Sequence, residues 1–183
     1  MFISIQDLEL RELAFREEFR PGLIDLGPDL EQQVPLKAAG RAVLLEEQHG
    51  GRGRIQDIRL VGEYSTRIQT RCARCLEAVE HKLASEFDLL FRPQGVDYRA
   101  DEVSISEAET EIGYYRGEGL QLEDVLKEQL LLAVPVKTLC REDCKGLCPT
   151  CGCNWNTEPC ACAPPIADVR WAALEDFKKK LES

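Results

Sequence analysis

The sequence predicts an α+β protein, with an antiparallel β-rich body, a packed helix, a cysteine-rich segment and a C-terminal helix. Three observations support this class. Two long segments alternate apolar and polar residues, an apolar stripe of helical spacing follows them, and seven cysteines fall within residues 140–162. We therefore divide the chain into a β-rich body with its helix over residues 1–138, a cysteine-rich segment over 139–163 and a terminal helix over 164–183.

Length and composition limit the classes of protein to which this chain can belong. The chain has 183 residues, 44% of them hydrophobic, and its 33 acidic against 23 basic side chains give a net charge of −10. That length fits one ordinary domain with at most a small appendage. The longest apolar runs, such as Leu130 to Val134, are far shorter than the roughly 20 residues of a membrane helix, so we expect no membrane span. The first residues carry early acids and neither a basic nor an apolar signal region, which favours a cytoplasmic protein.

The body begins with short elements and continues in a strand. Up to about Val34, apolar and charged residues mix and the chain breaks at Pro21-Gly22 and Gly27-Pro28, so we expect short strand or helix pieces. Near-alternation from Leu36 predicts a strand, which ends at a glycine-rich loop over residues 49–54.

Two long strands should follow that loop. Apolar or β-favouring residues occupy one face at even positions: Ile58, Leu60, Gly62, Tyr64, Thr66, Ile68 and Thr70. The next strand, over residues 79–91, places its large apolar residues at odd positions: Leu83, Phe87, Leu89 and Phe91. Cys72 and Cys75 should therefore lie at the turn between two antiparallel strands.

The remaining elements are two possible edge strands and two helices. Residues 93–118 are acidic and weakly periodic, with possible strands over 102–106 and 112–115. A packed helix over 121–133, which Pro135 ends, is predicted by the stripe Leu122, Val125, Leu126, Gln129 and Leu130. A terminal helix is predicted by Asp168 as N-cap and by one apolar face: Trp171, Leu174, Phe177 and Leu181.

The cysteines are the most informative residues. Nine is an odd number, and in a reducing compartment cysteines serve metal or redox chemistry more often than disulfides. Zn²⁺ takes four tetrahedral ligands, and a Cys-x-x-Cys turn brings two thiolates to one ion. The close pairs predict two sets of four ligands: Cys148 and Cys151 with Cys160 and Cys162, and Cys72 and Cys75 with Cys140 and Cys144. We therefore expect one or two zinc ions.

Several alternatives stay open for these residues. Cys153 has no place in the two sets, so a single zinc with spare thiols, or Cys153 replacing one of the last pair, would also fit. Cys72 and Cys75 could instead be small buried hydrophobes at a strand end. Thiol exchange is disfavoured, because a thioredoxin-like motif lies between a strand and a helix, whereas the flanks of Cys72 and Cys75 resemble strands.

No catalytic site is visible in the sequence, so we expect a protein that is not an enzyme. A catalytic zinc keeps an open position and often uses histidines, and the chain holds only His49 and His81. Both are expected to be ordinary surface residues. No Walker loop, dinucleotide-binding glycine fingerprint or Gly-x-Ser-x-Gly elbow is present.

Local charge suggests two contact surfaces. Between residues 52 and 74 the net charge is +4, through six arginines: Arg52, Arg54, Arg59, Arg67, Arg71 and Arg74. Guanidinium groups suit phosphates. The odd-numbered arginines, Arg59, Arg67 and Arg71, should point away from the even-numbered core face of the strand. The alternative is that the arginines are solvated residues on the outside of a hairpin. Residues 97–128 have a net charge of −7. This segment would suit a basic partner such as a ribosomal protein, or it is simply a solvated loop and helix face.

Taken in order, several motifs are similar to those of one family. The chain carries Cys72-Ala-Arg-Cys75-Leu-Glu, then Leu89-Leu-Phe-Arg-Pro93, Leu130-Leu-Leu-Ala-Val-Pro135, Leu139-Cys140, Cys144-Lys-Gly-Leu-Cys148-Pro-Thr-Cys151-Gly152 and Asp168-Val-Arg-Trp-Ala-Ala-Leu174. This ordered set resembles the YceD family, the large ribosomal RNA subunit accumulation proteins of bacteria and plastids, over nearly the whole chain. The family pattern has Asn-Leu-Asn after the Cys-Gly turn, where this chain has Asn154-Trp155-Asn156, and Cys153 is an addition.

The resemblance implies a non-enzymatic role in the accumulation or processing of large-subunit ribosomal RNA. We expect a ribosome-biogenesis factor that binds ribosomal RNA or a pre-ribosomal particle. Two other hypotheses remain: a zinc and thiol redox sensor or chaperone that releases metal on oxidation, and an acidic adaptor for basic ribosomal proteins. The sequence leaves the oligomeric state open.

Overall fold

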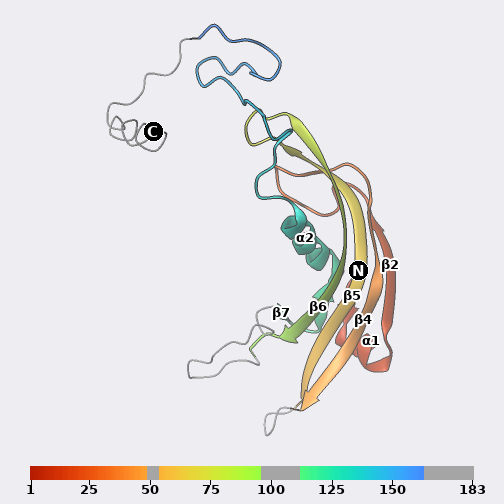
Figure 1. The fold of residues 1–183 in the computed structure, drawn as a ribbon. Helices are drawn as coiled ribbons and strands as arrows, with labels where there is room; N and C mark the ends of the chain where they lie inside the picture. Colours follow the sequence, from red (N-terminus) through yellow and green to blue (C-terminus); the bar gives the residue numbers. More distant parts are fainter. Residues whose placement is uncertain (49–53, 96–111, 163–183) are drawn as a thin grey trace, which may run out of the picture.

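The computed structural model describes residues 1–48, 54–95 and 112–162. A curved sheet of long strands carries one helix on the inner side of its bend, and the cysteine-rich chain lies beyond one end of the strands (Figure 1). This arrangement confirms a β-rich α+β protein. In chain order the elements are β1 (Phe2–Ser4), α1 (Ile5–Leu10), β2 (Leu13–Phe19), β3 (Glu31–Gln32), β4 (Leu36–Gln48), β5 (Arg54–Arg71), β6 (Ala78–Pro93), β7 (Ile112–Tyr115), β8 (Gly119–Gln121) and α2 (Leu122–Ala133).

The described strands form two sheets. The larger one has the order β2-β4-β5-β6-β7, and β3 pairs with β5 off this path. β2, β4, β5 and β6 pair antiparallel, whereas β7 pairs parallel with β6, and β1 pairs antiparallel with β8. The predicted strand over residues 112–115 is therefore confirmed. The predicted strand over 102–106, most of the glycine-rich loop and the C-terminal helix lie outside the described residues.

The first residues form the short pieces that the sequence suggests. Ser4 ends β1 and caps α1, because its Oγ accepts a hydrogen bond from the backbone N–H of Asp7 at 3.1 Å. Phe15 and Phe19 of β2 are buried, so this strand contributes to the core although its sequence carries a weak signal.

The inner face of the sheet forms the hydrophobic core with α2. Ile58, Leu60 and Ile68 of β5 are fully buried, which confirms the even-numbered core face. The stripe of α2 is buried as well, at Leu122, Val125, Leu126 and Leu130, and the Tyr64 hydroxyl donates to the backbone O of Gln129 at 3.4 Å. In the described part of the chain, neither helix is long and apolar enough to cross a membrane.

Two glycines make room for aromatic rings on this inner face. Gly40 of β4 faces Gly62 of β5, and Phe15 and Phe87 lie on either side of them in the same cross-strand row. A Cβ on Gly40 would lie 2.8 Å from the Phe15 Cζ, and one on Gly62 would lie 2.9 Å from the Phe87 Cζ. The glycines therefore allow both rings to approach the strands closely, which is a common role of glycine in a sheet.

Candidate metal centres

Eight of the nine cysteines gather in two groups of four. Quartet 1 contains Cys72, Cys75, Cys140 and Cys144, and quartet 2 contains Cys148, Cys151, Cys160 and Cys162. Within each group all four Sγ atoms lie within 4.8 Å of one another. The structure therefore brings together the eight predicted ligands in the two predicted sets.

Quartet 1 joins two segments that are distant in the sequence. Cys72 and Cys75 lie in the turn between β5 and β6, and Cys140 and Cys144 lie in the chain that follows α2. The Sγ atoms of Cys72 and Cys144 are 3.8 Å apart, and those of Cys75 and Cys140 are 3.5 Å apart. The quartet 1 cysteines therefore bring the chain after α2 to the tip of the β5–β6 hairpin.

Backbone and side-chain hydrogen bonds support the same junction. The N–H of Ala73 donates to the backbone O of Thr138 at 2.8 Å, and the N–H of Leu147 donates to that of Arg74 at 3.1 Å. The Arg74 guanidinium in turn donates to the backbone O of Cys144 at 2.7 Å. Arg74 therefore also supports the junction at quartet 1, and the RNA contact expected for it stays a prediction.

His81 also belongs to this junction. Its Nε2 lies 3.0 Å from the Thr70 Oγ1 and 3.3 Å from the Oγ1 of Thr138, which follows α2. Thr138 is buried and His81 is half-buried. His81 is therefore not the ordinary surface residue that its charged strand suggests, because the chain after α2 covers it.

Quartet 2 is built from one short stretch of chain. The Cys160 Sγ lies 3.4 Å from that of Cys148 and 3.5 Å from that of Cys151. The backbone N–H of Cys162 points at the Cys160 Sγ, at 3.3 Å. All four cysteines fall within 15 residues, so this group can form without the sheet.

The two Cys-x-x-Cys turns share one backbone pattern. In the first turn the N–H of Leu76 donates to the backbone O of Cys72 at 3.0 Å, and the N–H of Cys72 donates to the backbone O of Glu77 at 2.8 Å. In the second turn the N–H of Gly152 donates to the backbone O of Cys148 at 2.9 Å, and the N–H of Cys148 donates to the backbone O of Cys153, also at 2.9 Å. The residue after the second cysteine has a positive φ in each case, 62° for Leu76 and 75° for Gly152.

Backbone N–H groups stabilise the thiolate form of the first cysteine in each turn. Burial raises the pKa of Cys72, but hydrogen bonds from the backbone of Cys75, Arg74 and Cys140 outweigh burial and bring that pKa to about 6. Backbone hydrogen bonds from Cys151 and Thr150 lower the pKa of Cys148 in the same way. A turn that stabilises a thiolate also suits metal ligation, because the thiolate is the ligand.

Other sulfurs in each quartet are kept protonated by their neighbours. The hydrogen bond to the Cys75 sulfur is the largest cause that raises the pKa of Cys140 to about 12. The hydrogen bond to the Cys160 sulfur is likewise the largest cause that raises the pKa of Cys162 to about 12. Four adjacent thiolates would repel one another strongly. A divalent cation removes this conflict because it replaces the protons and binds all four sulfurs as thiolates.

The distances fit a tetrahedral zinc ion. Four sulfurs at about 2.3 Å from one zinc stand roughly 3.8 Å apart. The sulfur pairs quoted above are separated by 3.4 to 3.8 Å. Four cysteine ligands are also a donor set that zinc uses in structural sites.

Cys153 lies beside quartet 2. Burial is the largest cause that raises the pKa of its thiol to about 12, and hydrogen bonds to the sulfurs of Cys151 and Cys160 contribute to that rise. Its backbone O closes the second turn by accepting from Cys148. Replacement of one quartet 2 ligand by Cys153 therefore stays a geometric alternative.

The arginines of β5 lie on the outer face of the sheet, opposite the core. Arg59, Arg67 and Arg71 are exposed, as the alternation predicts. Arg59 donates twice to Asp88, from Nε to Oδ1 at 2.8 Å and from Nη2 to Oδ2 at 2.6 Å. This pairing raises the pKa of Arg59 and lowers that of Asp88.

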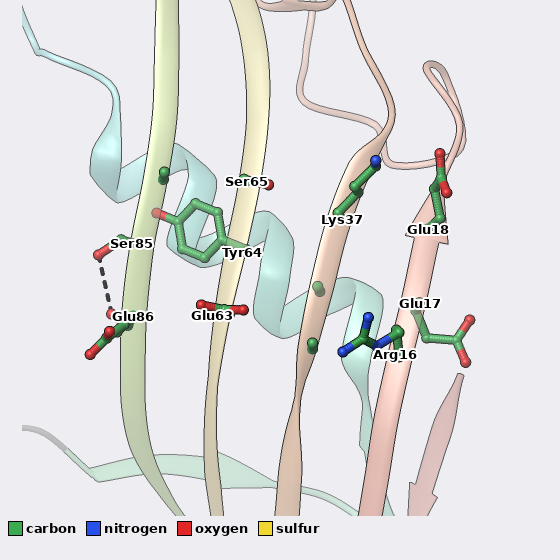
Figure 2. Close-up of a pocket in the computed structure, with 12 residues that line it drawn as sticks. Arg16, Glu17, Glu18, Lys37, Glu63, Tyr64, Ser65, Ser85 and Glu86 are labelled. Atoms are coloured by element: carbon green, nitrogen blue, oxygen red, sulfur yellow. Dashed lines mark hydrogen bonds between the residues drawn. The ribbon is translucent and has the colours of Figure 1, made fainter.

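Acidic residues offset the positive charge elsewhere on the outer face. The Arg67 Nη1 lies 3.7 Å from the Oε1 of Glu80. An open hollow of about 950 Å³ on this face, with α2 behind the strands in the view of Figure 2, is lined by basic and acidic side chains that include Arg16, Lys37, Glu63 and Glu86. The outer face is therefore mixed in charge rather than a continuous basic surface.

The remaining two predicted arginines cannot be placed on this face. Arg52 lies outside the described residues, and so does the side chain of Arg54, whose backbone begins β5. Of the six arginines, the structure therefore groups three on the outer face, and it places Arg74 beside quartet 1.

Sequence reasoning missed the polar side chains that hold the cysteine loops. Asn154 donates from Nδ2 to the Glu77 Oε1 at 2.9 Å, and Asn156 donates from Nδ2 to the Cys144 Sγ at 3.3 Å. The Asn156 Oδ1 also accepts from the backbone N–H of Lys145 at 2.8 Å. Two asparagines two residues apart inside a cysteine-rich segment were the available signal.

Comparison with known proteins finds relatives in bacteria and plants. It is 35% identical over 106 residues to an uncharacterized protein of Mycobacterium tuberculosis, which covers 58% of this chain and 48% of that protein. Two chloroplastic proteins named large ribosomal RNA subunit accumulation protein YCED homolog 1 also match. The Zea mays protein is 26% identical over 136 residues, which cover 62% of this chain and 45% of that protein. The Arabidopsis thaliana protein is 23% identical over 150 residues, which cover 68% of this chain and 46% of that protein.

These matches are partial on the side of the relatives. The chain spans about half the length of the curated relatives it matches. No solved structure matches it. The model of the family described as large ribosomal RNA subunit accumulation protein YceD matches residues 60–178, which include both cysteine quartets. Because this match covers well over half of the sequence, the chain belongs to the YceD family.

Proposed function

We propose that this chain is a non-enzymatic ribosome-biogenesis factor that supports accumulation or processing of large-subunit ribosomal RNA. Its family and the names of its two plant relatives support the process. The observation that carries the biochemical part is the pair of quartets, each complete with four sulfur donors. A full set of protein ligands is typical of structural metal sites, whereas catalytic zinc keeps a position for water.

The eight quartet cysteines would hold two Zn²⁺ ions. Each ion would replace a hydrophobic core in a stretch of chain that has few apolar residues, and its binding free energy would order that stretch. Quartet 1 would fix the chain after α2 to the β5–β6 turn, and quartet 2 would fold residues 148–162. The proposed role of the metal is to present a rigid surface to a partner.

The proposed partner is ribosomal RNA or a pre-ribosomal particle. Arg59, Arg67 and Arg71 share the outer face of β5, and such a row could follow a phosphate backbone if their acidic neighbours exchange partners. Arg71 adjoins the quartet 1 turn, so the metal end of the hairpin is the proposed centre of this contact. The cytoplasmic location stays a prediction for this chain.

A depletion experiment tests this function. In cells depleted of this protein, large-subunit ribosomal RNA should fall relative to small-subunit ribosomal RNA, and the parent chain should restore the ratio. A chain with Cys72→Ser and Cys148→Ser should not restore it, whereas a matched chain with Ser85→Ala, a change on β6 outside both quartets, should. An unchanged ratio on depletion would contradict the proposal.

Exposed sulfurs support the redox sensor as a second candidate. Cys140, Cys151 and Cys162 are exposed, so an oxidant could reach both quartets. Co-sedimentation with large-subunit precursors in a gradient favours the biogenesis factor, whereas zinc release by low peroxide concentrations favours the sensor. The acidic adaptor would crosslink to basic proteins rather than to RNA, and much of its candidate segment, residues 97–128, lies outside the described residues.

A further inference from the structure

We propose that Asn156 couples the two quartets, so that a metal ion in quartet 2 raises the metal affinity of quartet 1. This inference rests on the proposed zinc binding and adds a positioning residue to it. Asn156 belongs to the loop between Cys151 and Cys160, which quartet 2 closes, but its side chain contacts quartet 1. Its Nδ2 donates to the Cys144 Sγ at 3.3 Å.

The other atoms of Asn156 fix the loop that carries the quartet 1 ligands. Its Oδ1 accepts from the backbone N–H of Lys145 at 2.8 Å and from the Arg141 Nη2 at 2.7 Å. Arg141 directly follows Cys140 in the sequence, and Lys145 directly follows Cys144. One side chain from quartet 2 therefore orients both the sulfur of Cys144 and the backbone beside it.

Asn154 holds Asn156 in this position. The Asn154 Oδ1 accepts from the backbone N–H of Asn156 at 3.0 Å and from its Nδ2 at 2.8 Å. The Asn154 Nδ2 donates to the Oε1 of Glu77, which lies two residues after Cys75. The two asparagines thus connect the quartet 2 loop to both halves of quartet 1.

Further backbone contacts keep the two loops in register. Leu147 and Asn154 form an isolated β-bridge, and the Trp155 N–H donates to the backbone O of Gly146 at 3.0 Å. Gly146 has a φ of 79°, and a Cβ there would lie 3.1 Å from the Arg74 backbone O. The chain between the quartets therefore turns tightly against the first Cys-x-x-Cys turn.

These contacts predict cooperative loading. A metal in quartet 2 would fix both ends of the loop between Cys151 and Cys160, so Asn156 would already be in place when quartet 1 binds its ion, and the entropy cost of ordering it would be smaller. Hydrogen bonds to metal ligands are worth roughly 10- to 100-fold in metal affinity. By linkage, quartet 1 must raise the affinity of quartet 2 by the same factor.

Site-resolved zinc occupancy tests the coupling. The full-length zinc-loaded protein is exposed to increasing chelator under reducing conditions, and free thiols are then alkylated and located by peptide mass spectrometry. Protection of Cys72 and Cys75 reports quartet 1, and protection of Cys160 and Cys162 reports quartet 2. In the parent chain, both quartets should lose zinc over the same chelator range.

Variants separate coupling from a general loss of structure. In the chain with Cys148→Ser and Cys160→Ser, quartet 1 should lose zinc at roughly ten-fold lower chelator. Asn156→Asp in an otherwise intact chain keeps the Oδ1 acceptor, removes the Nδ2 that donates to Cys144 and Asn154, and should give a similar shift. Added to the double-serine chain, Asn156→Asp should have little further effect. Glu158→Gln, at an exposed position of the same loop, should behave as the parent.

The outcomes distinguish this inference from the proposed function. An unchanged quartet 1 midpoint in the double-serine chain would overturn the coupling while zinc binding stands. No protection of either quartet at any zinc concentration would overturn zinc binding and the coupling with it. Hydrogen exchange of β5 and β6 checks that each variant keeps its sheet, and the double-serine chain tests the coupling even if Asn156→Asp fails to fold.

Discussion

The two quartets use the same turn in two different settings. Cys72, Cys75 and Cys144 of quartet 1 are buried and form a small apolar cluster with the partly buried Val79, Leu139 and Leu147. In quartet 2 Cys148 is buried, but Cys151 and Cys162 are exposed and no hydrophobic cluster of the described residues includes this group. Quartet 1 is therefore supported by packing as well as by sulfur, whereas quartet 2 depends on sulfur ligation and on hydrogen bonds.

This difference shows how one backbone motif can serve two purposes. At the hairpin the turn joins strands that pair through fourteen cross-strand positions, from Ile58 opposite Phe91 to Arg71 opposite Ala78, so its strands hold without metal. In residues 148–162 the turn is the main organiser of an irregular chain. We infer that metal strengthens a junction at quartet 1 and creates the local fold at quartet 2.

Complete removal of metal should have the largest effect. With chelator, residues 148–162 should lose nearly all protection from hydrogen exchange, residues 139–147 should lose part of it, and β4, β5 and β6 should keep theirs. The physical reason is that structural zinc contributes apparent free energies of about 10–16 kcal/mol in small peptides that lack a core. Equal protection of residues 139–162 with and without chelator would contradict this prediction.

Single serine substitutions should divide that effect into two footprints. Cys148→Ser should leave about one zinc ion per chain and expose residues 148–162, whereas Cys72→Ser should expose the hairpin turn and residues 139–147. The loss of protection should be deeper in the first footprint, because few apolar residues support that segment. Metal analysis and peptide-level hydrogen exchange measure both, and identical footprints would remove the distinction between the quartets.

The close cysteine pairs could be predicted from the sequence because their spacing is local. A Cys-x-x-Cys pair spans one turn, so the sulfurs of Cys148 and Cys151 can reach one ion whatever the rest of the fold is. Strand alternation likewise predicts which side of β5 is buried, since a side chain's face follows from its parity. These features are local and require no knowledge of which segments meet.

The contacts of Asn156, Arg59 and His81 could not be predicted in that way. Asn156 reaches Cys144 only because the two loops fold against each other, and Arg59 reaches Asp88 only in the observed register of β5 and β6. His81 is covered by Thr138, which follows α2 and lies 57 residues away in the sequence. Such contacts depend on register and long-range packing, which one sequence does not reveal.

A substitution in the sheet provides the opposite test to the cysteine variants. Gly62→Ala would place a Cβ 2.5 Å from the Ala39 backbone O and 2.9 Å from the Phe87 Cζ. Overpacking of this kind costs about 1–3 kcal/mol, so the melting temperature should fall. The zinc content should stay at the parent value, because the site lies away from both quartets. A simultaneous loss of zinc would show that the sheet and the quartets unfold as one unit.

The arginine row should give the smallest effect. A lysine or arginine that neutralises one phosphate contributes a slope of about 0.9 to the dependence of log affinity on log salt. Arg71→Gln should therefore flatten that slope by nearly one unit in a filter-binding or fluorescence assay with large-subunit ribosomal RNA fragments.

Arg59→Gln provides the matched comparison on the same face. It should change the slope less than Arg71→Gln, because Asp88 already pairs with Arg59 through two hydrogen bonds and must be displaced before a phosphate can bind. Arg67, at 3.7 Å from Glu80, should fall between the two. Equal effects at all three positions would show that these ion pairs open without cost in the complex. An unchanged affinity and slope in the triple glutamine variant, with β5 still protected from exchange, would exclude the outer face of β5 as the RNA contact and contradict the contact centred on Arg71.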